Sequence, residues 1–160
     1  MKKKTVNGVL LVSIITLMFA CNTNKEEPAA MVDTAQIKIA IQAKEDSFAA
    51  VYNAGVVKNI GYYADDATSF YQNRQPLVGK QAIIDFLMSD VHENPNKITF
   101  QTKEVFPSND GNQVVELGYF KVVDSANNPI NTGNYMVLFQ KRNGNYVSVR
   151  DMSASDRPVE

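Results

Sequence analysis

Hydrophobic positions recur at helical spacing in the first part of the chain beyond residue 33. Apolar side chains three, four or seven residues apart fall on one face of an amphipathic helix, which Asp33 or Thr34 caps at its start. The apolar stripe consists of Ile37, Ile41, Phe48, Val51 and Tyr52. The polar face is expected to carry mostly Lys38, Gln42, Glu45 and Asp46. Asn53-Ala54-Gly55 supplies a C-terminal stop.

Two shorter helices are expected next. One begins near Val57, turns Ile60 and Tyr63 inward, and ends at Asp65-Asp66, before a strand over 67–71 and a turn over 73–76. Gly79-Lys80 opens the other helix, which Pro95 closes. Its buried stripe consists of Ile83, Ile84, Leu87, Met88 and Val91.

From Lys97 onward the hydrophobic period changes to two, which is typical of strands. Strands are predicted over 97–103, 114–123, 134–142 and 146–153, with turns at 109–111 and 127–129. Asn143-Gly144 is a hairpin signal, because both residues tolerate positive φ. Helices followed by an antiparallel meander predict an α+β fold with the helices on one face of a curved sheet. One long helix does not fill such a sheet, so we expect a hollow at its open end.

The N-terminus has the pattern of an export signal. Three lysines at 2–4 precede an uncharged apolar run of 12 residues, Val9–Ala20, which is too short to cross a bilayer comfortably. Leu17-Met18-Phe19-Ala20-Cys21 resembles a lipobox, although Met18 stands where that motif prefers leucine. The resemblance implies that Cys21 is lipidated, cleaved and anchored in a membrane; a short anchor helix or a soluble periplasmic protein with a free cysteine are the alternatives.

This interpretation divides the chain into a signal peptide over 1–20, a polar tether over 21–32 and a domain over 33–157. It places the protein in the cell envelope, at the outer membrane. Lys25-Glu26-Glu27 is similar to a signal for export to the cell surface, but it also fits a solvated linker.

The amino-acid composition excludes several classes of function. Removing the three leading lysines changes the formal net charge from −1 to −4, which argues against nucleic-acid binding. One cysteine and one histidine exclude an intrachain disulfide and metal sites built from several such ligands. We find no phosphate loop, nucleophile elbow or zinc motif, and we expect no metal and no cofactor.

Four segments in one order carry a family likeness. FAAVYNAG at 48–55, YADDAT at 63–68, VGKQAIIDF at 78–86 and NGNYVSVRDM at 143–152 resemble the nuclear transport factor 2-like superfamily, especially its SnoaL-like and calmodulin-kinase-association-like branch. The likeness covers about residues 34–156. It implies a cone-shaped α+β fold with a curved antiparallel sheet packed on a long N-terminal helix and two shorter helices. It also implies dimerisation through the sheet.

Within that superfamily, ketosteroid isomerase uses a tyrosine, an aspartate base and a protonated carboxylic acid. The resemblance places these roles at Phe48, Tyr71 and near Leu138, where none of the required groups occurs. We therefore expect a cavity without this acid–base set, and favour a protein that is not an enzyme.

Individual residues leave alternatives open. His92, at a helix end, fits a surface position better than a catalytic one. Asp65-Asp66 fits turn chemistry better than an acid–base pair. Arg150 and Asp151 face opposite sides of the last strand, so one of them can enter the hollow. The pocket candidates are Phe48, Tyr52, Tyr71, Phe86, Tyr119 and Arg150.

Three functions remain. The first is a lipoprotein domain that binds a small apolar or amphipathic ligand, or a protein partner. The second is a hydrolase, lyase or isomerase acting on a small carbonyl compound by acid–base chemistry, through Tyr71, Arg150 or Asp151. The third is a structural homodimer whose sheet face is the working surface.

Overall fold

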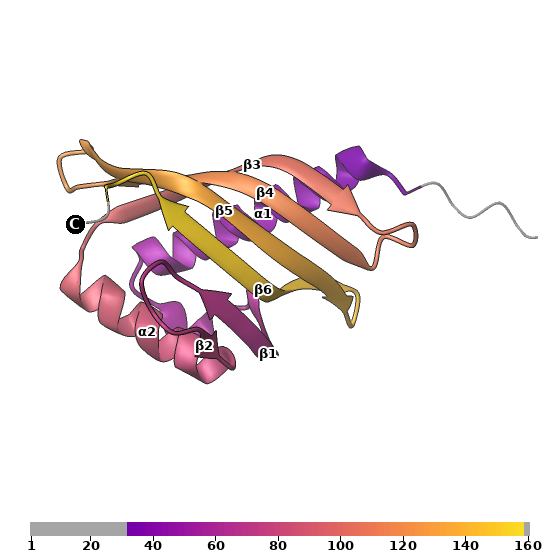
Figure 1. Ribbon diagram of the computed structural model, residues 1–160, viewed down its shortest axis with the longest axis horizontal. Helices are drawn as coiled ribbons and strands as arrows, with labels where there is room; N and C mark the ends of the chain where they lie inside the picture. The colour runs from indigo at the N-terminus through magenta and orange to yellow at the C-terminus, as the bar shows by residue number, and fades with distance from the viewer. Residues whose placement is uncertain (1–31, 159–160) are drawn as a thin grey trace, which may run out of the picture.

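The computed structural model describes residues 32–158 (Figure 1). The expected signal peptide, the tether and Cys21 lie outside these residues. Within residues 32–158, no helix combines the length and apolar character that crossing a bilayer requires.

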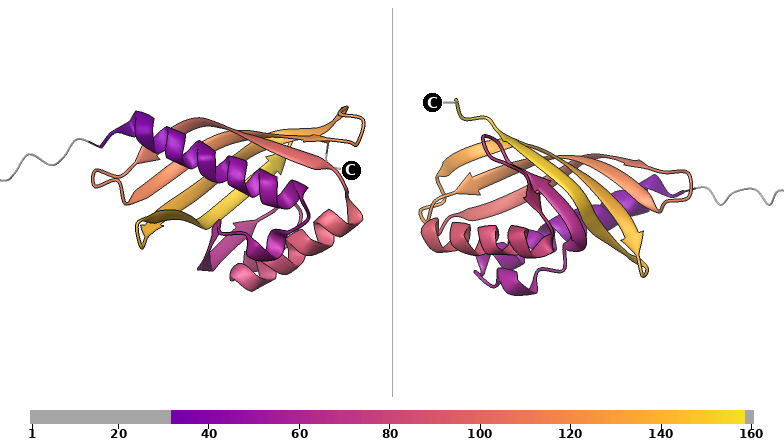
Figure 2. Two further views of the ribbon diagram at one scale, coloured as in Figure 1. Left: turned by 180° about the vertical axis from the view of Figure 1, so that it is seen from behind. Right: turned by 60° about the horizontal axis from the view of Figure 1, so that its bottom comes forward.

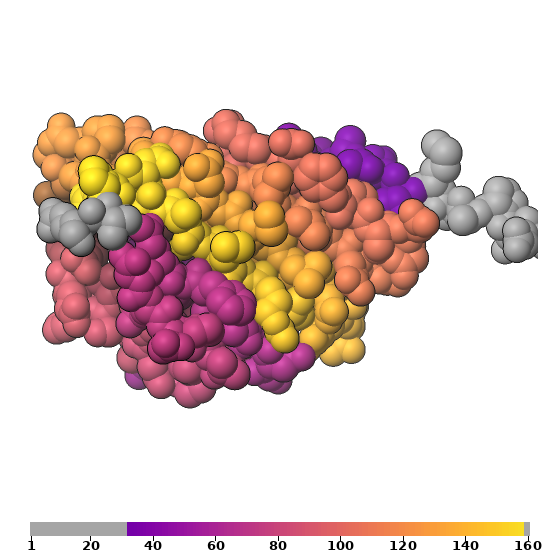
Figure 3. Space-filling view, in the orientation of Figure 1, coloured from indigo at the N-terminus to yellow at the C-terminus, as the bar shows by residue number. Residues whose placement is uncertain are grey.

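Within residues 32–158, two helices lie on one face of a six-stranded curved sheet, and no described helix covers the other face (Figures 2 and 3). The helices are α1 (Thr34–Asn53) and α2 (Lys80–Glu93). The strands are β1 (Tyr63–Phe70), β2 (Leu77–Val78), β3 (Lys97–Pro107), β4 (Gln113–Val123), β5 (Pro129–Arg142) and β6 (Asn145–Ser155). They pair in the order β2-β1-β6-β5-β4-β3.

The sheet is mixed, which corrects the expected purely antiparallel sheet. Strands β3 to β6 form the predicted antiparallel meander, but β1 pairs with β6 in parallel. A parallel pair needs a long crossover, and here most of the domain lies between the two strands. The two-residue alternation of apolar and polar side chains identifies a strand, but it does not show whether the neighbouring strand runs parallel or antiparallel.

Local signals place the ends of α1 as predicted. The Asp33 side chain accepts a hydrogen bond from the backbone N–H of Gln36 at 3.0 Å and so caps the helix. Gly55, with φ of 71°, follows the helix end. The Asn143-Gly144 hairpin is confirmed, with φ of 52° and 80°.

The second predicted helix is wrong. Val57–Asn59 form only a single 3₁₀ turn, and β1 already begins at Tyr63. The apolar spacing of Val57, Ile60 and Tyr63 fits a helix, but it fits a short turn followed by a strand equally well. Strand β5 likewise begins at Pro129 rather than Asn134.

Side-chain amides of α1 cover the free edge of the sheet at β3. The Gln42 Nε2 donates to Phe100 O at 3.2 Å, and Gln42 Oε1 accepts from Thr102 N at 2.8 Å. At the last residue of α1, Asn53 makes the same pair of bonds with the backbone of Ile98, at 2.9 and 2.8 Å. These bonds satisfy backbone groups of an edge strand and hold α1 at a fixed place across the sheet.

Candidate functional site

A cavity of about 260 Å³ lies between the helices and the inner face of the sheet. Most of its wall is apolar, and nine of the lining residues are aromatic. The helices contribute Phe48, Tyr52 and Phe86, the segment around β1 contributes Tyr62, Tyr63 and Tyr71, and the meander contributes Phe100, Phe120 and Tyr135.

Phe48 is the centre of this aromatic wall. Its ring centroid lies 4.9 Å from that of Tyr62 and 5.4 Å from that of Phe100, both in edge-to-face geometry. Tyr52, one helical turn further, stacks on it at 6.1 Å. Such pairs add to the burial energy of the rings and fix their positions. The cavity therefore has a closely packed aromatic wall on the α1 side.

Four of the six pocket candidates line the cavity. Phe48 and Tyr52 come from α1, Phe86 comes from α2, and Tyr71 follows β1. The rings of Tyr71 and Phe86 lie 4.7 Å apart. Ligand binding by these residues stays a prediction.

Tyr119 does not line the cavity. Phe120, its neighbour on β4, faces inward, so Tyr119 faces the other side of the sheet, opposite Gln101 and Asn134. Tyr119 was a pocket candidate because it belongs to an aromatic-rich set of residues. Only the strand register shows which face of the sheet it occupies.

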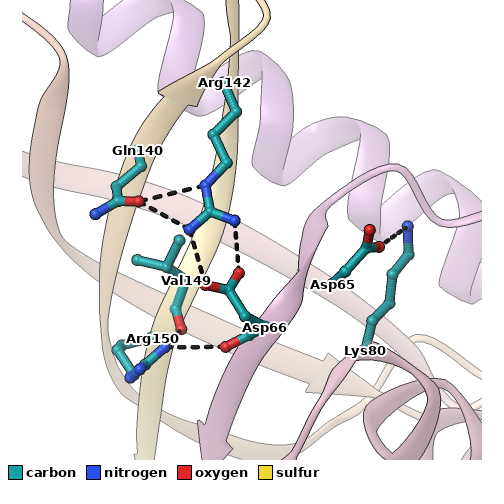
Figure 4. Close-up of polar contacts among 7 residues, drawn as sticks. All are labelled: Asp65, Asp66, Lys80, Gln140, Arg142, Val149 and Arg150. Carbon is teal, nitrogen blue, oxygen red and sulfur yellow. Dashed lines mark hydrogen bonds and ion pairs between the residues drawn. The ribbon is translucent and has the colours of Figure 1, made fainter.

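Arg150 also lies outside the cavity, on the outer face of the sheet (Figure 4). Its Nη1 donates to the backbone oxygen of Asp66 at 3.2 Å. Arg150 and Asp151 do face opposite sides of β6, and Asp151 is the one whose side chain enters the cavity. An arginine at the surface keeps its hydration, whereas burying an unpaired cation is costly.

Asp65 and Asp66 lie inside β1 rather than at a turn. The pairing of β1 with β6 is irregular between Tyr63 and Thr68, and there both carboxylates are exposed. Asp66 accepts two hydrogen bonds from Arg142, at 2.5 and 3.0 Å, and Lys80 lies 3.8 Å from Asp65 (Figure 4). The Arg142 guanidinium lowers the pKa of Asp66. Asp65 and Asp66 therefore form surface ion pairs, rather than the expected turn or the alternative acid–base pair.

Asp151 provides the main polar group of the cavity. Its Oδ1 is buried and has no hydrogen-bond partner, while its Oδ2 lies 3.4 Å from the Tyr63 hydroxyl. Burial raises the pKa of Asp151 to about 6, because the charged form loses hydration. Burial also raises the pKa of Tyr71 to about 12, with the Asp151 charge as the next cause.

A second carboxylate, Glu45, lies in the core rather than on the polar face of α1. The expected polar position of Glu45 is wrong, because residue 45 falls between Ile41 and Phe48 on the apolar face, and its side chain is only 2% exposed. Its charge suggested solvent, whereas its helical position, four residues after Ile41, indicated the core. Tyr62 donates a hydrogen bond to Glu45 Oε1.

Glu45 shares the core with Glu116 of β4. The Glu116 Oε1 accepts hydrogen bonds from Thr102 at 2.6 Å and from Tyr135 at 2.8 Å. Burial, followed by the charge of Glu116, raises the pKa of Glu45 well above its ordinary value. Burial raises the pKa of Glu116 as well, while its hydrogen bonds oppose that rise. These shifts favour the protonated form of Glu45, because two adjacent buried carboxyls disfavour a second negative charge.

Asp90 of α2 adds a third carboxylate to the cavity wall. The Tyr52 hydroxyl donates a hydrogen bond to Asp90 Oδ2, which connects α1 to α2. Burial is the main cause that raises the pKa of Tyr52 far above its ordinary value, so this hydroxyl keeps its proton. His92, two residues further, is exposed and does not line the cavity.

The cavity contains acid–base groups, but not at the positions that ketosteroid isomerase uses. Phe48 and Tyr71 occupy the isomerase positions inside the cavity without an acid, and Leu138 lies beside the lining residue Val137 rather than on the wall. The carboxylates come instead from Glu45, Asp90 and Asp151. Within the described residues, no cluster of three or more acidic, histidine or cysteine side chains is suited to a metal ion.

Similar solved structures share this arrangement of helices and sheet. A ketosteroid isomerase-like protein from Erwinia carotovora atroseptica is 17% identical with a TM-score of 0.61, over 76% of this chain and 97% of that one. A calcium/calmodulin-dependent protein kinase II association domain from Xanthomonas campestris, itself described as putative, is 14% identical with a TM-score of 0.57, over 78% and 88%. The domain has the nuclear transport factor 2-like fold.

A third nuclear transport factor 2-like neighbour, from Catenulispora acidiphila, was solved in complex with S-DNPA. It is 13% identical with a TM-score of 0.65, over 76% of this chain and 95% of that one. No family model matches the sequence, and no curated protein does. The likeness to these structures concerns the fold, so the activity has to be argued from the cavity of this chain.

Proposed function

We propose that this domain binds a small, largely apolar molecule that carries one polar group, inside the cavity between α1, α2 and the sheet. The observation that carries the proposal is the buried, unpartnered Oδ1 of Asp151 in an aromatic wall. Leaving such an oxygen without a partner costs about 1–3 kcal/mol, and a ligand that donates a hydrogen bond to it recovers that cost.

The aromatic wall supplies the apolar part of recognition. Rings such as Phe48, Tyr63 and Phe100 are held by edge-to-face contacts and by the backbone of α1 and the sheet. A preformed cavity loses little conformational entropy on binding. A small number of polar groups in an apolar cavity is typical of sites that orient a small molecule.

The test uses the neutral probe tryptophol, a planar ring with a hydroxyl, titrated into the purified full chain by calorimetry. Ser153 lines the cavity from β6, and Ser153→Phe is expected to weaken binding about tenfold or more by filling it. Its neighbour Ala154 is exposed and absent from the cavity wall, so Ala154→Phe serves as the matched control. Equal affinities for the two variants, or no binding to the unmodified chain, would count against this function.

We also propose that the domain is a membrane-tethered lipoprotein, attached through a lipid on Cys21 and located at the outer membrane. The lipobox-like segment before the sole cysteine supports this. Several buried acyl chains make release slow, because each buried CH₂ contributes about 0.8 kcal/mol. Labelled palmitate is expected to enter the chain in its host and not the Cys21→Ala variant. Label in both would contradict the tether.

A second candidate is an enzyme that acts on a small carbonyl compound. The pKa of about 6 makes Asp151 a carboxylate that is ionised, yet still basic, at neutral pH. A base of this kind removes a proton from the carbon next to a carbonyl, and solvent returns it. Deuterium uptake from D₂O into a panel of cyclic ketones, lost in Asp151→Asn, would support the enzyme. Uptake equal to a buffer blank would reject it for that panel.

We further propose that a second copy of the chain packs on the outer face of the sheet. No helix of residues 32–158 covers this face, and apolar residues paired across four strands form a row on it: Leu117, Met136, Met152 and Phe70. Met136 is 43% and Met152 52% exposed. Light scattering is expected to show a dimer that Met136→Asp converts to a monomer. A monomer in the unmodified chain would remove this proposal.

A further inference from the structure

We propose that the ligand of this cavity is a cation, a protonated amine joined to an apolar ring. The inference rests on the proposed binding function and specifies its ligand. The geometry that carries it is the combination of three carboxyl groups, from Glu45, Asp90 and Asp151, with an aromatic wall that contains no lysine, arginine or histidine. A wall of this composition attracts positive charge and repels anions.

The carboxyl groups differ in what they can offer. Asp151 Oδ1 makes no hydrogen bond within the described residues, and the Ser69 hydroxyl, from the residue paired with Asp151 across β1 and β6, is the polar group that opposes the rise of its pKa most. Asp90 already accepts hydrogen bonds from Tyr52 and from Asn94. Glu45 is bound to Tyr62. Asp151 is thus the group with a free acceptor, and an ammonium group has donors to fill it.

The charges at neutral pH follow from the surroundings. Burial raises the pKa of Asp151 to about 6, so this carboxyl is mostly ionised at neutral pH. Burial and Glu116 raise the pKa of Glu45 well above its ordinary value, which favours its neutral form. Tyr63 and Tyr71, which face Asp151, have raised pKa values and stay neutral as well. The Asp151 charge is therefore not cancelled by a neighbouring cation.

No lysine or arginine of the described residues forms an ion pair with a carboxylate of the cavity. The two ion pairs of the described residues join Lys80 to Asp65 and Arg142 to Asp66. Arg74, from the segment between β1 and β2, lies 4.2 Å from the centroid of the Phe86 ring and makes no ion pair with Asp90 or Asp151. This contact also shows that a ring of the wall accepts a cation on its face.

The experiment compares three probes that share one ring and differ in charge. Tryptamine is protonated at about pH 7.5, tryptophol is neutral and indole-3-acetate is an anion. Calorimetric titration of the purified full chain is expected to give tryptamine an affinity about tenfold or more above that of tryptophol, with indole-3-acetate the weakest. Lowering the pH to about 5 is expected to reduce the preference, because Asp151 then becomes protonated.

Two variants test whether Asp151 causes the preference for tryptamine over tryptophol. Asp151→Asn keeps the side-chain shape and is expected to reduce the tryptamine preference to less than about threefold while tryptophol still binds. Asp85→Asn removes an exposed carboxylate of α2 that does not line the cavity, and is expected to keep the full preference. Thermal melting of each variant establishes that it is folded.

The outcomes separate this inference from the function on which it rests. Tryptophol binding equal to or tighter than tryptamine, or tightest binding of indole-3-acetate, would overturn the cation while leaving the cavity a binding site. A preference that survives in Asp151→Asn would overturn the assignment to this carboxylate. Absence of binding by all three probes would reject the binding function and the inference together.

Discussion

The hydroxyl of Tyr63 lies 3.4 Å from Oδ2 of Asp151, while the other oxygen of that carboxylate is buried without a partner. The two residues belong to the first and the last strand, β1 and β6, which pair in parallel. The parallel pairing therefore brings the carboxylate to the aromatic wall. A half-satisfied carboxylate there costs stability and remains available to a ligand.

The stability of the domain is expected to fall as pH rises through the range in which Asp151 ionises. Its pKa is raised to about 6 in the folded state, above the ordinary 3.8, so the unfolded chain loses this proton first. Relative to Asp151→Asn, the free energy of unfolding is expected to decrease by about 3 kcal/mol between about pH 4 and 7. Urea unfolding of both proteins at a series of pH values measures this difference in unfolding free energy. Asp85→Asn is the control and should follow the unmodified chain; a constant difference for Asp151→Asn would contradict the raised pKa.

Glu45 is expected to act as a neutral hydrogen-bonding group in the core. Glu45→Gln keeps an acceptor for Tyr62 and a donor for Glu116, so it should change the free energy of unfolding by less than about 1 kcal/mol near pH 6. Glu45→Leu removes both and should cost about 2–3 kcal/mol. The pKa of Glu45 is raised in the fold, so its contribution is lost at high pH, and Glu45→Gln should gain stability relative to the unmodified chain there. Equal unfolding curves for the two variants would show that the hydrogen bonds contribute nothing.

Gly118 is expected to tolerate no side chain, because the Tyr135 ring occupies that space. A Cβ on Gly118 would lie 2.0 Å from the ring of Tyr135, which bonds Glu116. Gly118→Ala should therefore destabilise the domain by about 1–3 kcal/mol through displacement of Tyr135. Gly61, with nothing within 4 Å of an added Cβ, is the matched control. Similar melting temperatures for Gly118→Ala and Gly61→Ala would show that the ring moves without cost.

The helices and the meander could be predicted because their signals are local. The α1 cap at Asp33, the α2 stripe and the Asn143-Gly144 turn depend on neighbours within a few residues. The parallel pairing of β1 with β6 could not be predicted, since it joins residues such as Thr68 and Arg150 that are far apart in sequence. A period of two in one strand carries no information on the direction of the next.

The cavity was partly predictable for the same reason. Phe48 and Tyr52 followed from the apolar face of one helix, but Tyr119 and Arg150 needed the strand register. Glu45 was missed because its charge outweighed its helical position, four residues after Ile41. Buried carboxylates of this kind depart from the usual rule that charges lie at the surface, and such departures gather at functional sites.

The most direct test of the account is the ionisation of Asp151, followed by carbon-13 NMR of its side-chain carboxyl in the full chain and assigned with Asp151→Asn. The free protein is expected to show a pKa of about 6 for this carboxyl. Saturation with tryptamine should lower that pKa by about one unit or more, because a cation beside the carboxylate favours its charged form. A pKa that stays the same when tryptamine is bound would contradict a ligand cation at Asp151.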